Sequence, residues 1–278
     1  MKKVISILTC LCLLMTTGCS RQETIRFGAA GVGGMYYPFA NAFTELASKD
    51  ETGINWKVKS TAGSAANLRL LSDNYIELGI AQADLIEDAY YGKGTFHSGK
   101  YRGYKAVASL YPEACQIIVR KDSDITSLDD LEGKNVSVGE EESGTERNAT
   151  QILEMCGLPD NLVNRKNLDY TDAADQLAEK KIDAFFCTAG ICTTVIEELT
   201  KECDIRLLEI PESCRQKLKK AYSFYDDYVI PAGTYSGQTE DIQTISVQSV
   251  LLASSTLSEK TVQKLTASLF KHIKDIQY

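Results

Sequence analysis

Three short segments of this sequence combine glycine, hydroxyl and amide residues in patterns that suit the binding of a small anion. They are Gly28–Pro38, Ser60–Asn67 and Gly139–Glu146. Each follows a short apolar run and precedes an amphipathic one, so each is expected to turn from a strand into a helix. Backbone N–H groups at a helix start attract anions, and nearby hydroxyls can add hydrogen bonds. The alternative for each segment is a turn that only starts or caps a helix.

The residues within these segments exclude nucleotide binding. The glycines of Gly28–Pro38 do not fit G-x-G-x-x-G, the dinucleotide pattern. Gly139–Glu146 resembles a phosphate-binding loop, but Thr145 stands where that loop requires lysine. Ser143 and Glu146 instead fit a capping box. In the second segment, Ser64 is expected to be the N-cap residue of a helix, with Asn67 three residues later.

The composition argues against an enzyme, a metal centre or a nucleic-acid partner. The 278 residues include 30 Lys+Arg and 38 Asp+Glu, a net charge of -8, which leaves little basic surface for phosphates. His97 and His272 are the two histidines and are far apart in sequence. No G-x-S-x-G elbow and no metal-ligand spacing occurs, and paired carboxylates such as Asp129 and Asp130 are adjacent and diverge. No cofactor is therefore expected.

Strands and helices alternate along the chain. Strands are expected at 24–28, 55–59, 78–81, 116–120, 135–139, 184–187 and 244–253, and helices at 38–49, 65–72, 84–91, 145–156, 172–179 and 258–274. A helical turn is expected at 127–131 and a mobile loop at 92–103. This order predicts an α/β protein with two doubly wound lobes, joined by crossover strands, and a ligand cleft between them. The expected division is 19–112 for the first lobe and 113–243 for the second, with 244–278 returning to the first.

The first residues predict export from the cytoplasm. A basic start, Met1 to Lys3, precedes the apolar run Val4–Met15 and the small residues before Cys19. Residues 1–18 therefore fit a lipoprotein signal peptide, with Cys19 lipidated and anchoring the protein to the outer face of the membrane. The alternative is ordinary cleavage near Gly18 and a periplasmic protein. No later segment is apolar enough to span a membrane.

Six cysteines remain after the signal segment and Cys19. An even number outside the cytoplasm permits disulfides, but the spacings match no zinc or redox motif. Free thiols are the alternative, and the pairing is left open. These cysteines are Cys115, Cys156, Cys187, Cys192, Cys203 and Cys214.

Seven motifs, taken together and in order, resemble the TAXI-type (TRAP-associated extracytoplasmic immunogenic) solute receptors of TRAP transporters. They are 33–38 (GGMYYP), 60–67 (STAGSAAN), 80–84 (IAQAD), 128–134 (LDDLEGK), 143–146 (SGTE), 181–186 (KIDAFF) and 230–235 (IPAGTY). The resemblance implies a type II periplasmic-binding-protein fold whose lobes close on a small ligand by hinge motion. It also implies a sodium-coupled membrane permease as partner. The implied ligand is glutamate or a dicarboxylate such as 2-oxoglutarate.

The resemblance also implies which residues bind the ligand. The first lobe would contribute Gly34, Tyr36, Tyr37, Ser64, Asn67, Gln82 and Asp84, and the second Ser143, Gly144 and Thr145. Backbone N–H groups and hydroxyls suit a carboxylate, whereas Asp84 would suit an α-amino group. The closing segment that the family carries after its last helix, with a histidine and paired tyrosines, has no counterpart after His272. A lipoprotein sensor that reports to a signalling protein is the alternative function.

Overall fold

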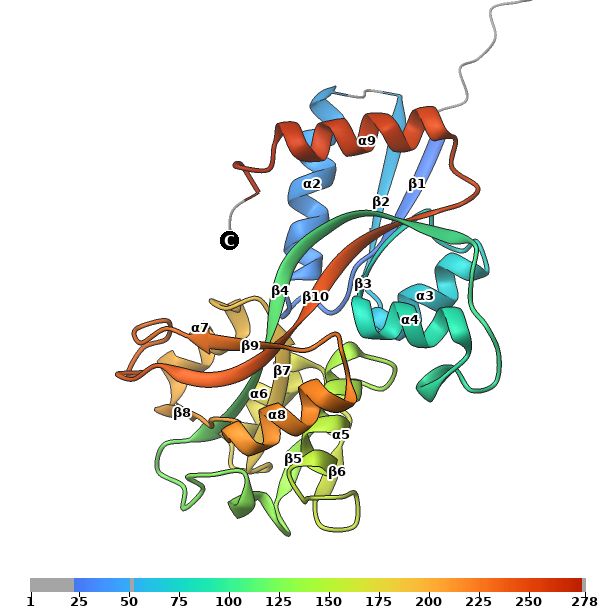
Figure 1. Cartoon of the computed structure of the whole chain (residues 1–278). Coiled ribbons are helices and arrows are strands. Elements are labelled where there is room, and N and C mark those ends of the chain that lie inside the picture. Colours follow the sequence, from blue (N-terminus) through green and yellow to red (C-terminus); the bar gives the residue numbers. More distant parts are fainter. Residues whose placement is uncertain (1–22, 51–52, 277–278) are drawn as a thin grey trace, which may run out of the picture.

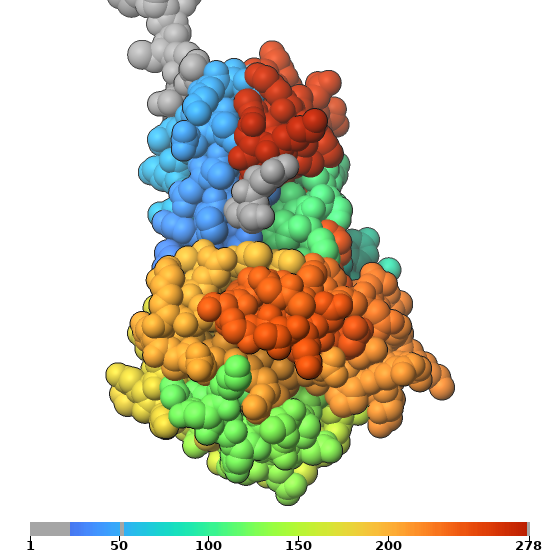
Figure 2. Space-filling model, turned by 90° about the vertical axis from the view of Figure 1, so that its left-hand side faces the viewer, coloured from blue at the N-terminus to red at the C-terminus, as the bar shows by residue number. Residues whose placement is uncertain are grey.

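Two long strands join two α/β lobes in the computed structural model, which describes residues 23–50 and 53–276 (Figure 1). The expected signal segment and Cys19 lie outside the described residues. Figure 2 shows the first lobe, with its blue N-terminal part and red C-terminal helix, standing on the broader second lobe. Within the described ranges, every helix is too short or too polar to cross a membrane.

The elements follow the expected alternation. The first lobe contains β1 (Glu23–Gly28), α2 (Tyr36–Asp50), β2 (Ile54–Lys59), α3 (Ser64–Ser72), β3 (Leu78–Gln82), α4 (Ala83–Tyr91), η2 (Gly94–Phe96) and α9 (Glu259–Lys271). The long strands are β4 (Tyr104–Arg120) and β10 (Ile242–Ser254). The second lobe contains η3 (Asp129–Leu131), β5 (Asn135–Ser137), α5 (Gly144–Met155), β6 (Asn164–Lys166), α6 (Tyr170–Ala178), β7 (Ala184–Ala189), α7 (Thr194–Glu202), β8 (Ile205–Leu207), α8 (Glu212–Ala221) and β9 (Asp226–Ile230).

The sheet confirms the predicted fold class. Its strand order is β2-β1-β3-β10-β4-β7-β5-β6, with β8 beside β4 and β9 beside β10. β1 pairs in parallel with β2 and β3, and β5 pairs in parallel with β6 and β7. β10 runs antiparallel to β3 and β4. The two long strands therefore carry the sheet from one lobe into the other, as crossover strands do.

Each lobe buries both faces of its part of the sheet. In the first lobe, Phe43 and Leu85 are fully buried in separate clusters on opposite faces. Ile152 and Ile196 do the same in the second lobe. Burying a side chain of this size stabilises the folded state by about 1.5–3 kcal/mol. The packed helices therefore hold the strand ends in fixed positions. A doubly covered sheet explains why the strands read as continuous apolar runs.

Some expected elements need correction. The expected strand 116–120 is only the end of β4, because the strand begins at Tyr104 and its residues between Tyr104 and Ala114 pair with β10. The expected mobile loop 92–103 contains η2, whose Phe96 is fully buried beneath the Arg69 guanidinium at 4.8 Å. The last helix ends at Lys271, and Ile273, expected on its apolar face, is 53% exposed.

The chain returns from the second lobe to the first within β10. Ile245 and Val247 pack in the core of the second lobe together with Val136. Leu251 and Ala253 pack in the first lobe. The return to the first lobe therefore lies after Val247, later than the expected boundary at 243/244.

Two of the six cysteines that follow Cys19 form a disulfide. Cys156 follows the last residue of α5 and is bonded to Cys214 in α8, which links two positions 58 residues apart in sequence within the second lobe. The other four are free: Cys115 and Cys187 are buried, Cys203 is half-buried and Cys192 is exposed. Both linked helices belong to the same lobe, so the bond leaves movement between the lobes unrestrained.

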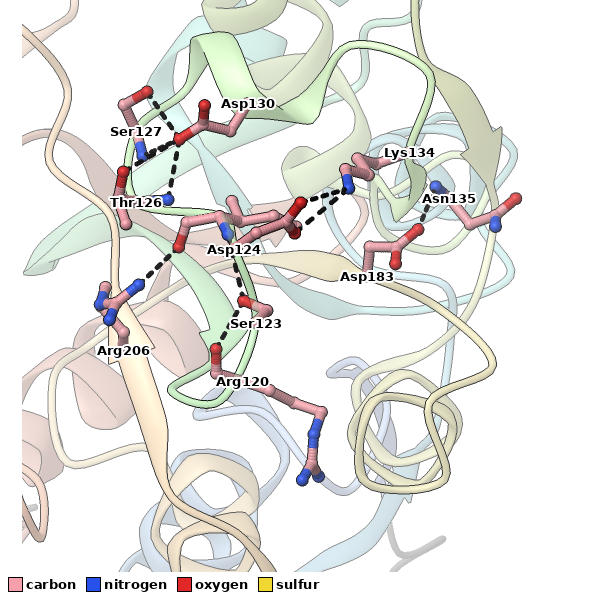
Figure 3. Close-up of polar contacts among 11 residues, drawn as sticks. Arg120, Ser123, Asp124, Thr126, Ser127, Asp130, Lys134, Asn135, Asp183 and Arg206 are labelled. Carbon is pink, nitrogen blue, oxygen red and sulfur yellow. Dashed lines mark hydrogen bonds and ion pairs between the residues drawn. The ribbon is translucent and has the colours of Figure 1, made fainter.

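Two of the seven sequence motifs build the second lobe away from the cleft (Figure 3). Asp130, in the motif at 128–134, accepts hydrogen bonds from the backbone and hydroxyl groups of Thr126 and Ser127. These bonds, chiefly from the Thr126 amide, lower the pKa of Asp130 to about 2. Asp183, in the motif at 181–186, accepts a 2.8 Å hydrogen bond from the Asn135 amide. These acidic residues hold turns, and their role is structural.

Candidate ligand-binding cavity

A cavity lies between the lobes and is lined by residues from both. It offers about 80 Å³ to the centres of water-sized molecules, where one water needs roughly 10–15 Å³. Such a space suits a compact small molecule. The lining residues are Ala30, Gly31, Val32, Gly33, Gly34, Met35, Tyr36, Ala62, Gly63, Ser64, Gln82, Glu113, Glu140, Ser143, Gly144, Thr145, Asp169, Tyr170, Thr171, Thr188 and Ala189.

The N-terminal ends of five helices contribute to this lining. The first residues of α2, α3 and α5 are Tyr36, Ser64 and Gly144, and all three line the cavity. The first amides of a helix have no acceptor within the helix and carry its positive dipole end. The starts of α4 and α6 are different, because Asp84 lies in the first turn of α4 and Asp169 caps α6. The ends of α2, α3 and α5 therefore form the part of the cavity that suits an anion.

The serines at the starts of α3 and α5 make different hydrogen bonds. Ser143 Oγ accepts a 3.0 Å hydrogen bond from the Glu146 amide, which confirms the capping role predicted for Ser143. The Glu146 carboxylate bonds the Glu142 amide, one residue before the position that a reciprocal box requires. Ser64 is the first residue of α3, not its N-cap, which is Gly63. Ser64 Oγ instead accepts a 3.1 Å hydrogen bond from the Gln82 amide and so joins α3 to the end of β3.

Tyr170 was not predicted from the sequence, and it forms the second-lobe wall together with Thr145. Its hydroxyl pairs with Thr145 Oγ1 and donates to the Thr188 carbonyl at 3.0 Å. Its ring lies against the first lobe, where a Cβ on Gly34 would come within 3.2 Å of it. Glycine at position 34 therefore permits the close approach of the two lobes.

Glu113, on β4, is the other important residue that the sequence interpretation missed. It is 2% exposed, and its carboxyl accepts hydrogen bonds from Gln82 Nε2 at 2.8 Å and from the Tyr36 hydroxyl at 3.3 Å. Burial raises the pKa of Glu113 to about 8. The available signal was its isolation, since it is the one charged residue in the apolar run from Ala106 to Val119.

The charged residues of the lining are all acidic. Among the described residues that line the cavity, Glu113, Glu140 and Asp169 are acidic and none is lysine, arginine or histidine. Burial, together with the nearby Asp169, raises the pKa of Glu140. The ranges 23–50 and 53–276 contain no cluster of three or more His, Cys, Asp or Glu side chains that could hold a metal ion.

Three of the ten expected ligand-binding residues lie outside the lining. Tyr37 packs half-buried against the first-lobe core. Asn67 is fully buried and donates through Nδ2 to the carbonyls of Gly28, Ala29 and Ile80. Asp84 is fully buried and accepts a 3.3 Å hydrogen bond from Asn148. The lining contains the other seven: Gly34, Tyr36, Ser64, Gln82, Ser143, Gly144 and Thr145.

Polar contacts bridge the lobes beside the cavity. Arg147 of α5 forms a 2.8 Å ion pair with Asp88 of α4. Arg69 of α3 forms a 2.7 Å ion pair with Glu142, in the loop before α5. The Glu142 carbonyl also accepts a 3.1 Å hydrogen bond from the Ala65 amide. These contacts can exist only while the lobes are together, so the structure represents a closed arrangement.

The burial of Asp84 between the lobes predicts a pH-dependent stability. Burial raises the pKa of Asp84 from 3.8 to about 7. The folded state therefore keeps a proton that the unfolded state loses, and stability falls as the pH rises from about 4 to 7. Asparagine carries no titrating proton, so Asp84→Asn should not lose stability in this way. The unfolding free energy of the variant relative to that of the wild type should therefore rise by roughly 1.4 kcal/mol per pH unit across that interval. Denaturant unfolding at pH 4, 6 and 8 measures the gain. Exposed Asp73→Asn is the control, and a pH-independent gain would contradict the prediction.

Solved structures with the same fold are binding proteins by their titles. The alkanesulfonate-binding protein SsuA from Xanthomonas axonopodis pv. citri, bound to MOPS, is 16% identical, with a TM-score of 0.55, over 91% of this chain and 72% of that chain. The substrate-binding protein of an amino acid ABC transporter is 15% identical, with a TM-score of 0.52, over 91% and 94%. An ancestral arginine-binding protein bound to arginine is 15% identical, with a TM-score of 0.54, over 92% and 94%. At these identities the likeness shows the periplasmic-binding-protein fold.

The family is shown by the sequence. Residues 27–278 match the NMT1-like family, and this range includes the second lobe, the first lobe except for the start of β1, both crossover strands and every residue that lines the cavity. The chain belongs to the NMT1-like family.

Proposed function

We propose that the protein is an extracytoplasmic binding protein that captures a compact organic anion between its lobes and delivers it to a membrane transporter. The observation that carries the proposal is the meeting of three helix N-termini, from α2 and α3 of one lobe and α5 of the other, at one cavity. An anion there would be held by both lobes at once, so binding would favour the closed arrangement. Hinge closure of this kind couples ligand capture to a change in shape that a transporter can recognise.

Binding, not catalysis, is the role proposed for the hydroxyl groups of the cavity. Ser64 Oγ accepts the Gln82 amide, and Thr145 Oγ1 accepts the Thr188 amide at 3.3 Å. A serine or threonine nucleophile needs a base within hydrogen-bond distance that takes its proton. Hydroxyls that accept from the backbone are better suited to position a ligand.

Glutamate and 2-oxoglutarate are the first ligands to test, because the resemblance to TAXI-type receptors implies them. The same resemblance supports TRAP-type permease subunits as the partner and lipidated Cys19 as the anchor. The titles of structural neighbours instead name an ABC transporter. Uptake assays with proteoliposomes that contain a candidate permease separate the two possibilities. A requirement for a sodium gradient supports the TRAP type, and a requirement for ATP supports the ABC type.

A thermal-shift screen of the protein from Ser20 against amino acids and dicarboxylates tests the proposed function. A ligand at 100 times its Kd stabilises the native state by about 2.7 kcal/mol. Thr145→Val should weaken that ligand about 2- to 12-fold, because it removes one hydrogen-bonding hydroxyl from the wall. Thr266→Val is the control, since Thr266 bonds the Val262 carbonyl within α9. The proposal fails if no compound shifts the melting temperature of folded protein.

A further inference from the structure

Glu142, in the loop before α5, contacts the first lobe through both its backbone and its side chain. Its carbonyl accepts a 3.1 Å hydrogen bond from the Ala65 amide, and its carboxylate forms the 2.7 Å ion pair with Arg69. Ala65 is the second residue of α3, so its amide has no acceptor within that helix. The second lobe supplies the acceptor, and it can do so only while the lobes are closed.

The first lobe holds Arg69 in position for this contact. The guanidinium carbon of Arg69 lies 4.8 Å from the ring centroids of both Phe96 and Tyr101. Its Nη2 also donates to the Thr95 carbonyl at 3.3 Å. These three partners belong to the first lobe, so the guanidinium is held there independently of the second lobe. Little side-chain freedom is therefore lost when Glu142 reaches it.

The second lobe holds Glu142 in a backbone conformation that residues other than glycine rarely adopt. Its φ is 65°, in the left-handed region. Its amide donates a 3.0 Å hydrogen bond to Glu146 Oε2, while Glu146 Oε1 accepts a 2.9 Å hydrogen bond from Asn167. Such a conformation costs free energy and persists only where the surrounding structure fixes it. The bonds to Glu146 fix it here, with the carbonyl and the carboxylate of Glu142 both directed at α3.

We propose that Glu142 is a latch that holds the lobes closed whether or not a ligand is bound, and that the cavity opens when its contacts with Ala65 and Arg69 break. Both contacts pass from one lobe to the other, so they must be lost on opening. Ala65, Arg69 and Glu142 lie outside the lining of the cavity, so the latch acts beside the ligand and not through contact with it. The inference goes beyond the proposed function, because it concerns when the cavity opens and not which anion enters.

Hydrogen exchange of the Ala65 amide in ligand-free protein, followed by NMR, tests the latch directly. That amide is protected only while the Glu142 carbonyl is in place, so its exchange rate reports the opening equilibrium. Glu142→Gln keeps the size of the side chain and the backbone acceptor but removes the charge that attracts Arg69. The Ala65 amide should then exchange about 2- to 5-fold faster, as expected for the loss of a half-exposed ion pair. The Asn67 amide is the internal control, because it bonds the Gly63 carbonyl within the first lobe and should exchange at an unchanged rate.

Matched variants assign the effect to the contact between Glu142 and Arg69. Glu141→Gln makes the same change at the exposed neighbouring residue and should leave the Ala65 rate unchanged. In Arg69→Gln protein, the added change Glu142→Gln should have no further effect, because the two residues act as a pair.

Three results would overturn the inference. One is an Ala65 amide that exchanges in the wild type as fast as an unprotected amide, a measurement that stands even if a variant does not fold. The second is equal rates in the wild type and Glu142→Gln. The third is an effect of Glu142→Gln that persists without Arg69. No ligand is present in these measurements, so the latch can fail while the proposed function stands, and the reverse.

Discussion

Replacing Gly144 by alanine is expected to weaken ligand binding about 5- to 150-fold, the effect of 1–3 kcal/mol of overpacking on the closed state. An added Cβ would lie within 2.3 Å of Gln82 Cδ and Oε1. Gln82 is 2% exposed and bonded to Glu113, so it has little room to withdraw. The clash crosses the cleft, so each lobe should fold normally while full closure is prevented.

Calorimetric titration and thermal unfolding of this variant separate the two effects. The affinity should fall while the melting temperature of ligand-free protein changes little. Gly99→Ala is the matched control, because a Cβ on Gly99 meets no atom within 4 Å. Wild-type affinity in Gly144→Ala would contradict the contact between Gln82 and α5 as part of the bound state.

Replacing Asn67 by alanine is expected to destabilise the first lobe by about 3 kcal/mol or more. Its Nδ2 donates to the carbonyls of Ala29 and Ile80 at 2.6 and 2.8 Å, and its Oδ1 accepts from Thr61 at 2.9 Å. These bonds join α3 to the ends of β1 and β3. Their loss would leave several buried polar groups unpaired, in addition to a cavity.

Urea unfolding measures this loss against a matched asparagine. Asn41 also lies within a helix and donates to a carbonyl, that of Tyr37, but it is exposed. Asn41→Ala makes the same change in helix propensity and should alter stability by no more than about 0.5 kcal/mol. A small effect at both positions would contradict the role of Asn67 in joining the strands.

The sequence predicted the elements that local patterns determine. β1, β3 and α5 were each expected within one or two residues, because apolar runs and glycine or capping residues mark their ends. The cleft position of Ser143–Thr145 followed from the same logic, since strand ends meet at one edge of a parallel sheet. Local patterns do not determine which way a side chain turns. Asn67 faces the sheet and not the cleft, because α3 packs that side against β1 and β3.

Glu113 and Tyr170 could not be placed from local patterns. Glu113 lies in β4, whose first half is a strand because it pairs with β10, over 130 residues later in the chain. Tyr170 reaches the cavity because α6 packs where the lobes meet, which depends on the arrangement of the whole second lobe. Both positions are consequences of long-range contacts.

The central position of β10 determines the order in which the chain can assemble. β10 lies between β3 and β4 in the first lobe, so these two strands have no partner on that side until Ile242–Ser254 joins them. The strands and helices of the second lobe are instead nearly continuous in sequence. Contacts between distant segments form slowly, because a long loop must close first. The second lobe needs only the first half of β10, which contains Ile245 and Val247, whereas the first lobe needs the second half of β10 and also α9. The second lobe can therefore be complete while the first lobe still lacks its last strand and helix, so truncation or proteolysis near the C-terminus should damage the lobe that begins the chain.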